Sequence, residues 1–287
     1  MTFSNGAFAD RVSGARAAIF DMDGTLVLGS ADGRGFAPLP GAVELIALLR
    51  RRAIPLRVFT NGTARTPRSY AAHLRQSGLD IDDAEMMTPA TSAAAWFVRR
   101  GVRRVRVLGT EGALEPLREA GIDVVGPGEA ASGVEAVFTA GYPGFGMADL
   151  EAACRDVWAG ADLATASHVP FYAVRGGRAI GVSFAMNKMI GALTGKQARV
   201  LGKPSRVAME CALRQMGVPL SAAGRTIVVG DDPALEMRMA RRMGAAAIAV
   251  TTGLADEAAF ARVAAAERPD MVLGGLGWII ETLQRSS

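Results

Sequence analysis

Short apolar runs alternate with amphipathic helical stretches along most of this 287-residue chain. Apolar runs rich in Val, Ile or Ala end at Asp21, at Thr60, at Gly230 and near Thr251, and polar residues or glycine follow each of them. Such alternation is typical of βαβ units in a mainly parallel sheet. It predicts an α/β fold with helices over residues 41–52, 67–77, 205–216, 234–243, 256–266 and 276–285.

The middle of the chain holds a second series of the same kind. Strands are expected over 105–108, 124–125, 136–139 and 162–165, and helices over 89–100, 111–120 and 147–159. Gly- and Pro-rich stretches separate several of them, as in loops. The simplest division is a core domain of residues 1–80 and 182–287, into which a second α/β domain of residues 81–181 is inserted.

Composition excludes several classes of protein. Half of the residues are hydrophobic, 21% are charged, and the net charge is only +4. The arginines are scattered, whereas nucleic-acid binders gather basic residues into a patch. Two cysteines and two histidines give neither a disulfide framework nor a histidine-based zinc site. We find no apolar stretch of transmembrane length and no secretory signal pattern, so we expect a cytoplasmic protein without nucleic-acid or membrane partners.

Paired acids mark the first strand end. The run Ala17–Phe20 stops at Asp21-Met-Asp23-Gly24-Thr25. An Asp-Gly turn explains Asp23, but it does not explain a second acid directly at the end of a buried strand. Ligands of open α/β sheets bind beyond the carboxyl ends of the strands. Two acids there suit either a hard cation such as Mg²⁺ or a nucleophile paired with a general acid.

Three further segments are placed in the same way. Thr60-Asn61-Gly62 closes the next core strand and precedes a helix beginning at Pro67, so a hairpin turn does not account for it. Lys203 stands just before another helix, where Ser205 can serve as the cap. A hydroxyl, the backbone N–H groups of a glycine loop and a lysine charge are all suited to phosphate oxygens.

The last segment is Gly230-Asp231-Asp232-Pro233. Asp232 as a cap and Pro233 at the first helical position form an ordinary helix start. Asp231 is not needed for that start, and it again stands at the carboxyl end of an apolar strand. If its strand neighbours that of Asp21, the two acids make an oxygen-rich cation site.

The order of these four segments resembles that of the haloacid dehalogenase-like hydrolases. Asp21-Met-Asp23-Gly-Thr is similar to their first motif, Thr60-Asn61-Gly62 to the second, Gly-Lys203-Pro to the third and Gly-Asp231-Asp232 to the fourth. The resemblance covers the whole core domain. It implies a Rossmann-like core with a parallel sheet flanked by helices, plus an inserted α/β cap domain.

The position of the inserted domain indicates which branch of the family the chain resembles. The stretch between Thr25 and Thr60 holds little more than one helix and one strand, whereas the long stretch lies between Thr60 and Lys203. This resembles the NagD-like branch with a type-2 α/β cap, which includes 4-nitrophenylphosphatases and the phosphatases of phosphoglycolate and pyridoxal phosphate. A homodimer formed through the cap is compatible with that resemblance.

The resemblance implies a Mg²⁺-dependent phosphatase of small phosphorylated metabolites. Asp21 would attack the phosphate monoester to form an aspartyl-phosphate, and Asp23 would serve as general acid and then base. Mg²⁺ would be held by the Asp21 carboxylate, the Asp23 backbone carbonyl and Asp231. Phosphate oxygens would be bound by Thr60, by the loop amides near Asn61 and Gly62, and by Lys203.

Some residues depart from the family pattern. Glu236 stands where the family often has an Asp after the fourth motif, so it and Asp232 are assigned only supporting roles. In the inserted domain the expected Thr-Asn-Pro-Asp phrase is replaced by Thr-Ala-Ser-His168. Candidates for substrate contact there are His168, Tyr172, Arg175 and Arg178, for which surface or packing roles are the alternative.

Two other functions stay open. A phosphotransferase or phosphomutase could use the same core, and it would pass the phosphoryl group to an acceptor. A catalytically idle binding protein for a phosphorylated metabolite would need a broken site, yet all four segments are intact.

Overall fold

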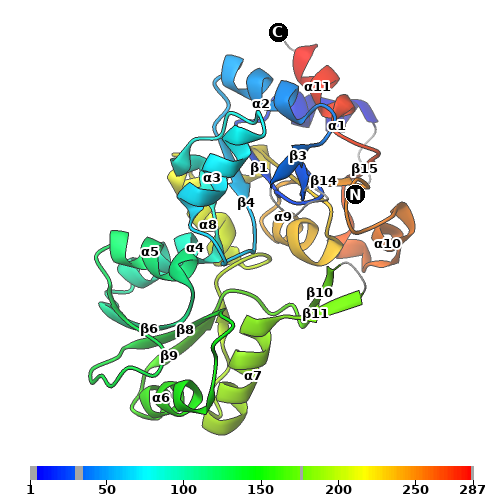
Figure 1. The fold of residues 1–287 in the computed structure, drawn as a ribbon. Helices are drawn as coiled ribbons and strands as arrows, with labels where there is room; N and C mark the ends of the chain where they lie inside the picture. Colours follow the sequence, from blue (N-terminus) through cyan, green and yellow to red (C-terminus); the bar gives the residue numbers. More distant parts are fainter. Residues whose placement is uncertain (1–4, 30–34, 175–176, 286–287) are drawn as a thin grey trace. The chain divides into compact units, whose positions relative to one another are not determined.

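The computed structural model describes residues 5–29, 35–174 and 177–285 (Figure 1). The chain forms two compact units. The first contains the described residues up to Thr60, Arg68–Met87 and the chain from Met209 onward, and the second contains Asn61–Pro67 and Thr88–Ala208. The predicted boundaries at 80/81 and 181/182 stay a prediction.

The first unit is built on a six-stranded sheet in the order β15-β14-β13-β1-β4-β5. Every neighbouring pair is parallel. The strands are β1 (Ala17–Phe20), β4 (Leu56–Phe59), β5 (Met86–Met87), β13 (Thr226–Gly230), β14 (Ala246–Val250) and β15 (Met271–Leu273). All residues of β1, β4, β13 and β14 are buried, as expected of strands covered on both faces. The predicted α/β class is confirmed.

The predicted helices of this region are present within a few residues of their expected ends. They are α2 (Ala42–Arg51), α3 (Pro67–Gln76), α8 (Arg206–Gln215), α9 (Arg238–Arg242) with the π-helical turn Pro233–Met237 before it, α10 (Glu257–Arg262) and α11 (Gly277–Gln284). The helix predicted over 256–266 ends early, at Arg262, and a separate 3₁₀ turn, Ala265–Glu267, follows it. Two further 3₁₀ turns are Asp83–Glu85 and Leu220–Arg225.

Strands β5 and β15 of the first unit were not predicted, and neither were several elements near its beginning. Helix α1 (Asn5–Ser13) precedes β1, and a short antiparallel ribbon joins β2 (Val27–Gly29) to β3 (Phe36–Pro38). Its strands are only three residues long, so alternation of polar and apolar residues could not reveal them.

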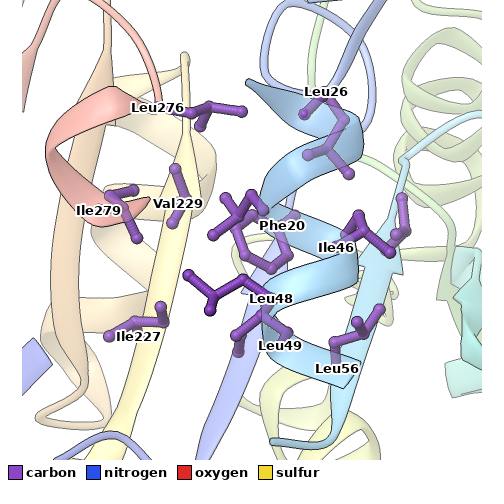
Figure 2. Close-up of a cluster of buried hydrophobic side chains, with 14 of the residues drawn as sticks. Phe20, Leu26, Ile46, Leu48, Leu49, Leu56, Ile227, Val229, Leu276 and Ile279 are labelled. Atoms are coloured by element: carbon purple, nitrogen blue, oxygen red, sulfur yellow. The ribbon is translucent and has the colours of Figure 1, made fainter. Parts of the chain in front are cut away.

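The core of the first unit lies between its sheet and the helices α2 and α11 (Figure 2). Leu48 and Leu49 of α2 are buried beside Phe20 of β1, while Ile279 of α11 packs near Val229 of β13. Fully burying one such side chain contributes about 1.5–3 kcal/mol. This packing fixes β1 and β13, and therefore the residues at their carboxyl ends.

The second unit is built on a five-stranded parallel sheet in the order β12-β9-β8-β6-β7. The strands are β6 (Arg104–Gly109), β7 (Asp123–Val125), β8 (Ala136–Gly141), β9 (Asp162–Thr165) and β12 (Arg199–Val200). Its helices are α4 (Pro89–Arg99), α5 (Glu111–Glu119), α6 (Met147–Trp158) and α7 (Val182–Thr194). One apolar cluster joins the sheet to α4 and α5, and another joins it to α6 and α7.

Most strands and helices of the second unit match the sequence prediction. The exceptions are α7, β12 and the antiparallel ribbon of β10 (Phe171–Val174) and β11 (Gly177–Ile180), which were not predicted as elements. Gly195, with φ of 72°, ends α7 as a glycine cap. No helix among the described residues is both long and apolar enough to span a membrane.

Candidate active site

Three neighbouring strands of the first unit end in the predicted polar residues. β1 lies between β4 and β13, and Phe20 of β1 is in register with both Val58 and Val229. Asp21, Thr60 and Asp231 directly follow these three strands. Because parallel strands end at the same edge of a sheet, these three residues share one edge. The condition for an oxygen-rich cation site is met, since the strands of Asp21 and Asp231 are neighbours.

The side chains of Asp21 and Asp231 are buried, whereas that of Asp23 is exposed. Asp21 is 8% exposed and Asp231 is 3% exposed, whereas Asp23 is exposed on the turn that follows β1. That turn is tight, because the N–H groups of Leu26 and Val27 both donate to the carbonyl oxygen of Met22. Burial of a carboxylate is costly unless hydrogen bonds or a cation compensate it. The edge of the sheet therefore concentrates negative charge where water is largely excluded.

Two glycines form a close-fitting cradle around Asp231. A Cβ atom added at Gly24 would lie 2.4 Å from Oδ2 of Asp231, and one added at Gly253 would lie 1.9 Å from the same oxygen. Gly24 also has a φ of 79°, which other residues rarely adopt. The N–H of Leu254 donates to Oδ2 at 2.8 Å. Any larger side chain at either glycine would displace this carboxylate.

Residues 251–254, which follow β14, support the same edge of the sheet. The Thr252 hydroxyl donates to the carbonyl oxygen of Gly24 at 2.6 Å, next to the bond from Leu254. Sequence reasoning identified the strand ending near Thr251 but assigned no role to the loop after it. The signal was available, since Thr-Thr-Gly follows a fourth apolar strand in the way that Thr-Asn-Gly follows β4.

These oxygens fit a hard divalent cation. Asp21 and Asp231 supply carboxylates, Asp23 can supply a backbone carbonyl, and Mg²⁺ prefers oxygen ligands of this kind. The described residues contain no group of three or more His, Cys, Asp or Glu side chains suited to a metal ion. The predicted set is of a different kind, because it has two side-chain carboxylates and one backbone carbonyl.

Asp232 and Glu236 stabilise the loop after β13. Oδ1 of Asp232 accepts from the N–H of Ala234 at 2.7 Å, which confirms the predicted helix cap. Glu236 is 1% exposed, and its Oε2 accepts from the N–H of Asp232 at 3.2 Å. Its side chain lies against Gly230, where a Cβ would approach Cγ of Glu236 to 2.3 Å. Glu236 thus holds the segment that carries Asp231.

The other predicted phosphate-binding residues belong to the second unit. The Asn61 side chain pairs with the backbone of Lys203: Nδ2 donates to the Lys203 carbonyl at 3.0 Å, and Oδ1 accepts from the Lys203 N–H at 2.9 Å. Lys203 is 1% exposed. Ser205 accepts from the N–H of Ala208 at 3.1 Å, so the predicted cap of α8 is confirmed. Gly62 is partly buried on the same loop as Asn61.

The segment after Asn61 is fixed within the second unit. The Thr63 hydroxyl donates to the Ala140 carbonyl at 2.6 Å, and the Thr110 hydroxyl donates to the Thr63 carbonyl at 3.0 Å. The structure thus groups Asp21, Thr60 and Asp231 on one sheet edge, and Asn61 with Lys203 on paired loops. The catalytic, metal-binding and phosphate-binding roles of these residues stay predictions.

One candidate for substrate contact lines a cavity of the second unit. His168, Lys188 and Lys196 contribute to the wall of this cavity of about 490 Å³, together with Asn187, Gly191, Ala192, Gly195, Gln197 and Ala198. Partial burial, and secondarily the nearby charge of Lys188, lowers the pKa of His168. His168 also makes an edge contact with the ring of Phe184.

Arg178 does not line that cavity. The Arg178 guanidinium lies over the Phe171 ring at 4.3 Å on the β10–β11 ribbon, and Arg178 is exposed. Tyr172 is on β10, but its side chain lies outside the described part of the structure. Arg175 lies outside the described residues altogether.

Comparison with known families supports the motif assignments. A haloacid dehalogenase-like hydrolase family matches residues 18–123, and a second, HAD-hydrolase-like family matches residues 200–279. The first match contains Asp21 and Thr60, and the second contains Lys203 and Asp231. All four segments that carried the resemblance therefore fall within matched regions.

Curated relatives extend over most of the chain. A phospholysine phosphohistidine inorganic pyrophosphate phosphatase of Bos taurus is 28% identical over 249 residues, which is 86% of this chain and 87% of the relative. A dihydroxyacetone phosphatase of Corynebacterium glutamicum is 28% identical over 252 residues, covering 84% and 83%. The similarity therefore includes both units.

Solved structures share the fold. A 4-nitrophenylphosphatase from Thermotoga maritima has a TM-score of 0.82 at 23% identity, with 96% of this chain and 99% of that chain covered. NagD from E. coli has a TM-score of 0.78 at 20% identity, covering 91% and 97%. A glycerol phosphate phosphatase from Mycobacterium tuberculosis in complex with magnesium has a TM-score of 0.79 at 24% identity, covering 95% and 77%. With its strand-end acids and these matches, the chain belongs to the haloacid dehalogenase-like hydrolases and has the fold of their NagD-like members.

Proposed function

We propose that this protein is a Mg²⁺-dependent phosphatase that hydrolyses small phosphorylated metabolites through an aspartyl-phosphate intermediate. The observation that carries the proposal is the pair of buried carboxylates, Asp21 and Asp231, at the ends of adjacent parallel strands. The curated relatives named above are phosphatases, which supports the same reaction class.

In the first step of the proposed mechanism, a carboxylate oxygen of Asp21 attacks the phosphorus atom. The bond between phosphorus and the leaving oxygen breaks, and Asp23 gives its proton to that oxygen. Exposure of Asp23 on the turn after β1 suits an acid that must meet a substrate and later a water molecule. Burial of Asp21 suits a nucleophile that must be held in one orientation.

In the second step, Asp23 takes a proton from water while the water oxygen bonds to phosphorus. The bond between phosphorus and Asp21 then breaks, which releases inorganic phosphate and restores both acids to their starting states. Asp21 would also hold Mg²⁺ together with Asp231 and the backbone carbonyl of Asp23. Bound Mg²⁺ supplies positive charge that offsets the charge of the phosphoryl oxygens.

The remaining phosphate oxygens would be bound by Thr60, by the backbone N–H groups near Asn61 and Gly62, and by the Lys203 ammonium. Donors fixed in advance stabilise charge that develops in the transition state without having to reorganise. Asp232 and Glu236 would act indirectly, since both hold the loop that carries Asp231.

Contact with the leaving group of the substrate is proposed for residues of the cap. His168 is the favoured candidate for contact with the leaving group, because it lines a cavity of the second unit. Tyr172, Arg175 and Arg178 remain candidates by their sequence position. A cytoplasmic location and a homodimer also remain proposals; the buried thiols of Cys154 and Cys211 suit a reducing compartment.

The decisive experiment measures release of inorganic phosphate from an aryl phosphate and from a set of sugar, glycerol and pyridoxal phosphates. Release is expected with Mg²⁺ and is expected to stop when a chelator is present in excess. Parallel assays with added acceptor alcohols distinguish hydrolysis from phosphoryl transfer. Stoichiometric transfer to an acceptor without phosphate release would indicate a phosphotransferase, and ligand-induced thermal stabilisation without turnover would indicate a binding protein.

A further inference from the structure

We propose that the Asn61 side chain is a positioning residue that fixes the backbone of Lys203, and that it acts on the reaction through this lysine. This inference rests on the proposed function, in which the Lys203 ammonium binds phosphate. It assigns Asn61 a different role from direct binding, which is left to the backbone N–H groups of its loop.

The geometry is a two-point contact. The Asn61 amide nitrogen donates to the Lys203 carbonyl at 3.0 Å, and the amide oxygen accepts from the Lys203 N–H at 2.9 Å. Both backbone polar groups of the lysine are therefore satisfied by one side chain that is 142 positions away in the sequence. An amide side chain is well suited to this task, because it carries a donor and an acceptor side by side.

The residue before the lysine leaves no room for the loop to shift. A Cβ added at Gly202 would lie 2.4 Å from the Ala166 carbonyl oxygen and 2.7 Å from Oδ1 of Asn61. The N–H of Gly202 donates to the same Ala166 oxygen at 3.2 Å. The backbone at positions 202 and 203 is thus packed against Asn61 on one side and against the chain after β9 on the other.

Fixing the backbone matters because the lysine side chain is long. Its four-carbon stem has many rotamers, and that freedom must be lost when the ammonium is held in one place. Lys203 is 1% exposed, so its stem is already confined by packing. The two hydrogen bonds from Asn61 add a restraint on the backbone from which this stem starts. A misplacement of about 1 Å in a group that binds the reacting phosphate can cost about 100-fold in rate.

A double-mutant cycle on kcat tests the inference in the full-length protein. Asn61→Ala is expected to lower kcat by about 10- to 100-fold, and Lys203→Ala is expected to lower it further. If Asn61 acts through the lysine, the double variant is expected to be no slower than Lys203→Ala alone. If the loss of kcat in the double variant equals the product of the two single losses, the inference is overturned. Free-energy effects of residues without a shared function are additive, so their fold-changes in kcat multiply.

Thr63→Val is the matched control. It removes a buried hydrogen bond of the same segment, to the Ala140 carbonyl, without touching Lys203. Its kcat is expected to stay within about threefold of the parent value, whereas a loss equal to that of Asn61→Ala would point to general loosening of the segment and contradict the inference. Gly202→Ala is expected to reproduce the loss of Asn61→Ala, since its Cβ would push the loop away.

The proposed function and the role of Asn61 would be contradicted by different results. Absence of Mg²⁺-dependent phosphate release by the unaltered protein would contradict the proposed function. Normal phosphate release by the unaltered protein, together with independent effects of the two substitutions on kcat, would contradict only the role of Asn61. Thermal midpoints of all variants identify any that fail to fold, and Gly202→Ala then replaces such a variant in the comparison.

Discussion

In the six-stranded sheet, the central strands β1 and β13 end in Asp21 and Asp231, whereas in the five-stranded sheet β6, β8 and β9 are followed by Thr110, Tyr142 and Ala166. Both sheets are parallel, are flanked by helices, and have buried apolar strands. The carboxyl ends of one carry buried charge, and those of the other carry neutral groups. A shared architecture therefore does not locate the chemistry, which depends on the residues placed at the strand ends.

The five-stranded sheet uses buried charge differently. Arg106 in β6 is 1% exposed, and its Nε donates to Asp156 of α6 at 2.5 Å. Nη1 of the same guanidinium donates to the carbonyl oxygens of Gly126 and Glu129, each at 2.9 Å. The pair thus joins a strand, a helix and a loop, because the Nε and Nη1 groups of Arg106 are hydrogen-bonded within the fold. We expect substitutions at this pair to affect stability, and substitutions at Asp21 to affect turnover.

The largest expected effect is loss of turnover in Asp21→Asn. The amide removes the attacking carboxylate, so phosphate release should fall by at least about 1,000-fold. The thermal midpoint should not fall, because the substitution relieves charge repulsion at a buried position. Steady-state assays and thermal unfolding measured on the same preparation check both parts. Retention of full activity would contradict the nucleophilic role.

The second effect lies in the other sheet. Asp156→Ala should destabilise the protein by about 3–5 kcal/mol, because it leaves the Arg106 charge buried without its partner. Asp123→Ala is the matched control, since Asp123 pairs with Arg104 at 3.1 Å on the surface of the same sheet. Loss of such an exposed pair should cost no more than about 1 kcal/mol. Denaturant unfolding of both variants gives the difference, and equal costs would contradict the comparison.

A third prediction concerns the cradle of Asp231. Gly253→Ala would place a Cβ atom on the carboxylate oxygen, so the Mg²⁺ concentration for half-maximal activity should rise by about 10- to 100-fold. Gly274→Ala serves as the control, because Gly274 follows another strand of the same sheet and has nothing within 4 Å of an added Cβ. Titration of activity with Mg²⁺ checks the pair. An unchanged requirement in Gly253→Ala would argue against Asp231 as a ligand.

The smallest expected effect is the pH dependence contributed by His168. Its pKa in the folded protein is lowered from 6.5 by partial burial and by Lys188. The unfolded chain therefore binds the proton more readily, so this contribution to stability is complete above pH 6.5 and is lost as the pH falls through the lowered pKa. His168→Gln should flatten the decline of the unfolding free energy over that range. An unchanged slope in His168→Gln would contradict the contribution of His168 to the pH dependence of the unfolding free energy.

The strand-end residues were predictable from sequence because each follows a buried apolar run directly. A two-residue pattern such as Phe20-Asp21 can be read without knowledge of distant contacts. The cradle of Asp231 was not predictable, since Gly24 and Gly253 meet it from positions far apart in the chain. The pairing of Asn61 with the Lys203 backbone was hidden for the same reason.

Elements were missed where the local signal was weak. Helix α7 consists mostly of apolar residues, so it lacks the separate polar and apolar faces that reveal a surface helix. Strands β5 and β12 have two residues each, which is too short for any periodicity. Their pairing with β4 and β9 is a product of the surrounding fold.

The cavity beside His168 has a practical consequence for chemical labelling. The chain has three lysines, and two of them, Lys188 and Lys196, are exposed at this cavity, while Lys203 is buried. An amine-reactive fluorophore under native conditions should therefore attach, apart from the N-terminal amine, at these two side chains. Without any added cysteine, the protein would carry reporters on α7 and on the loop after it.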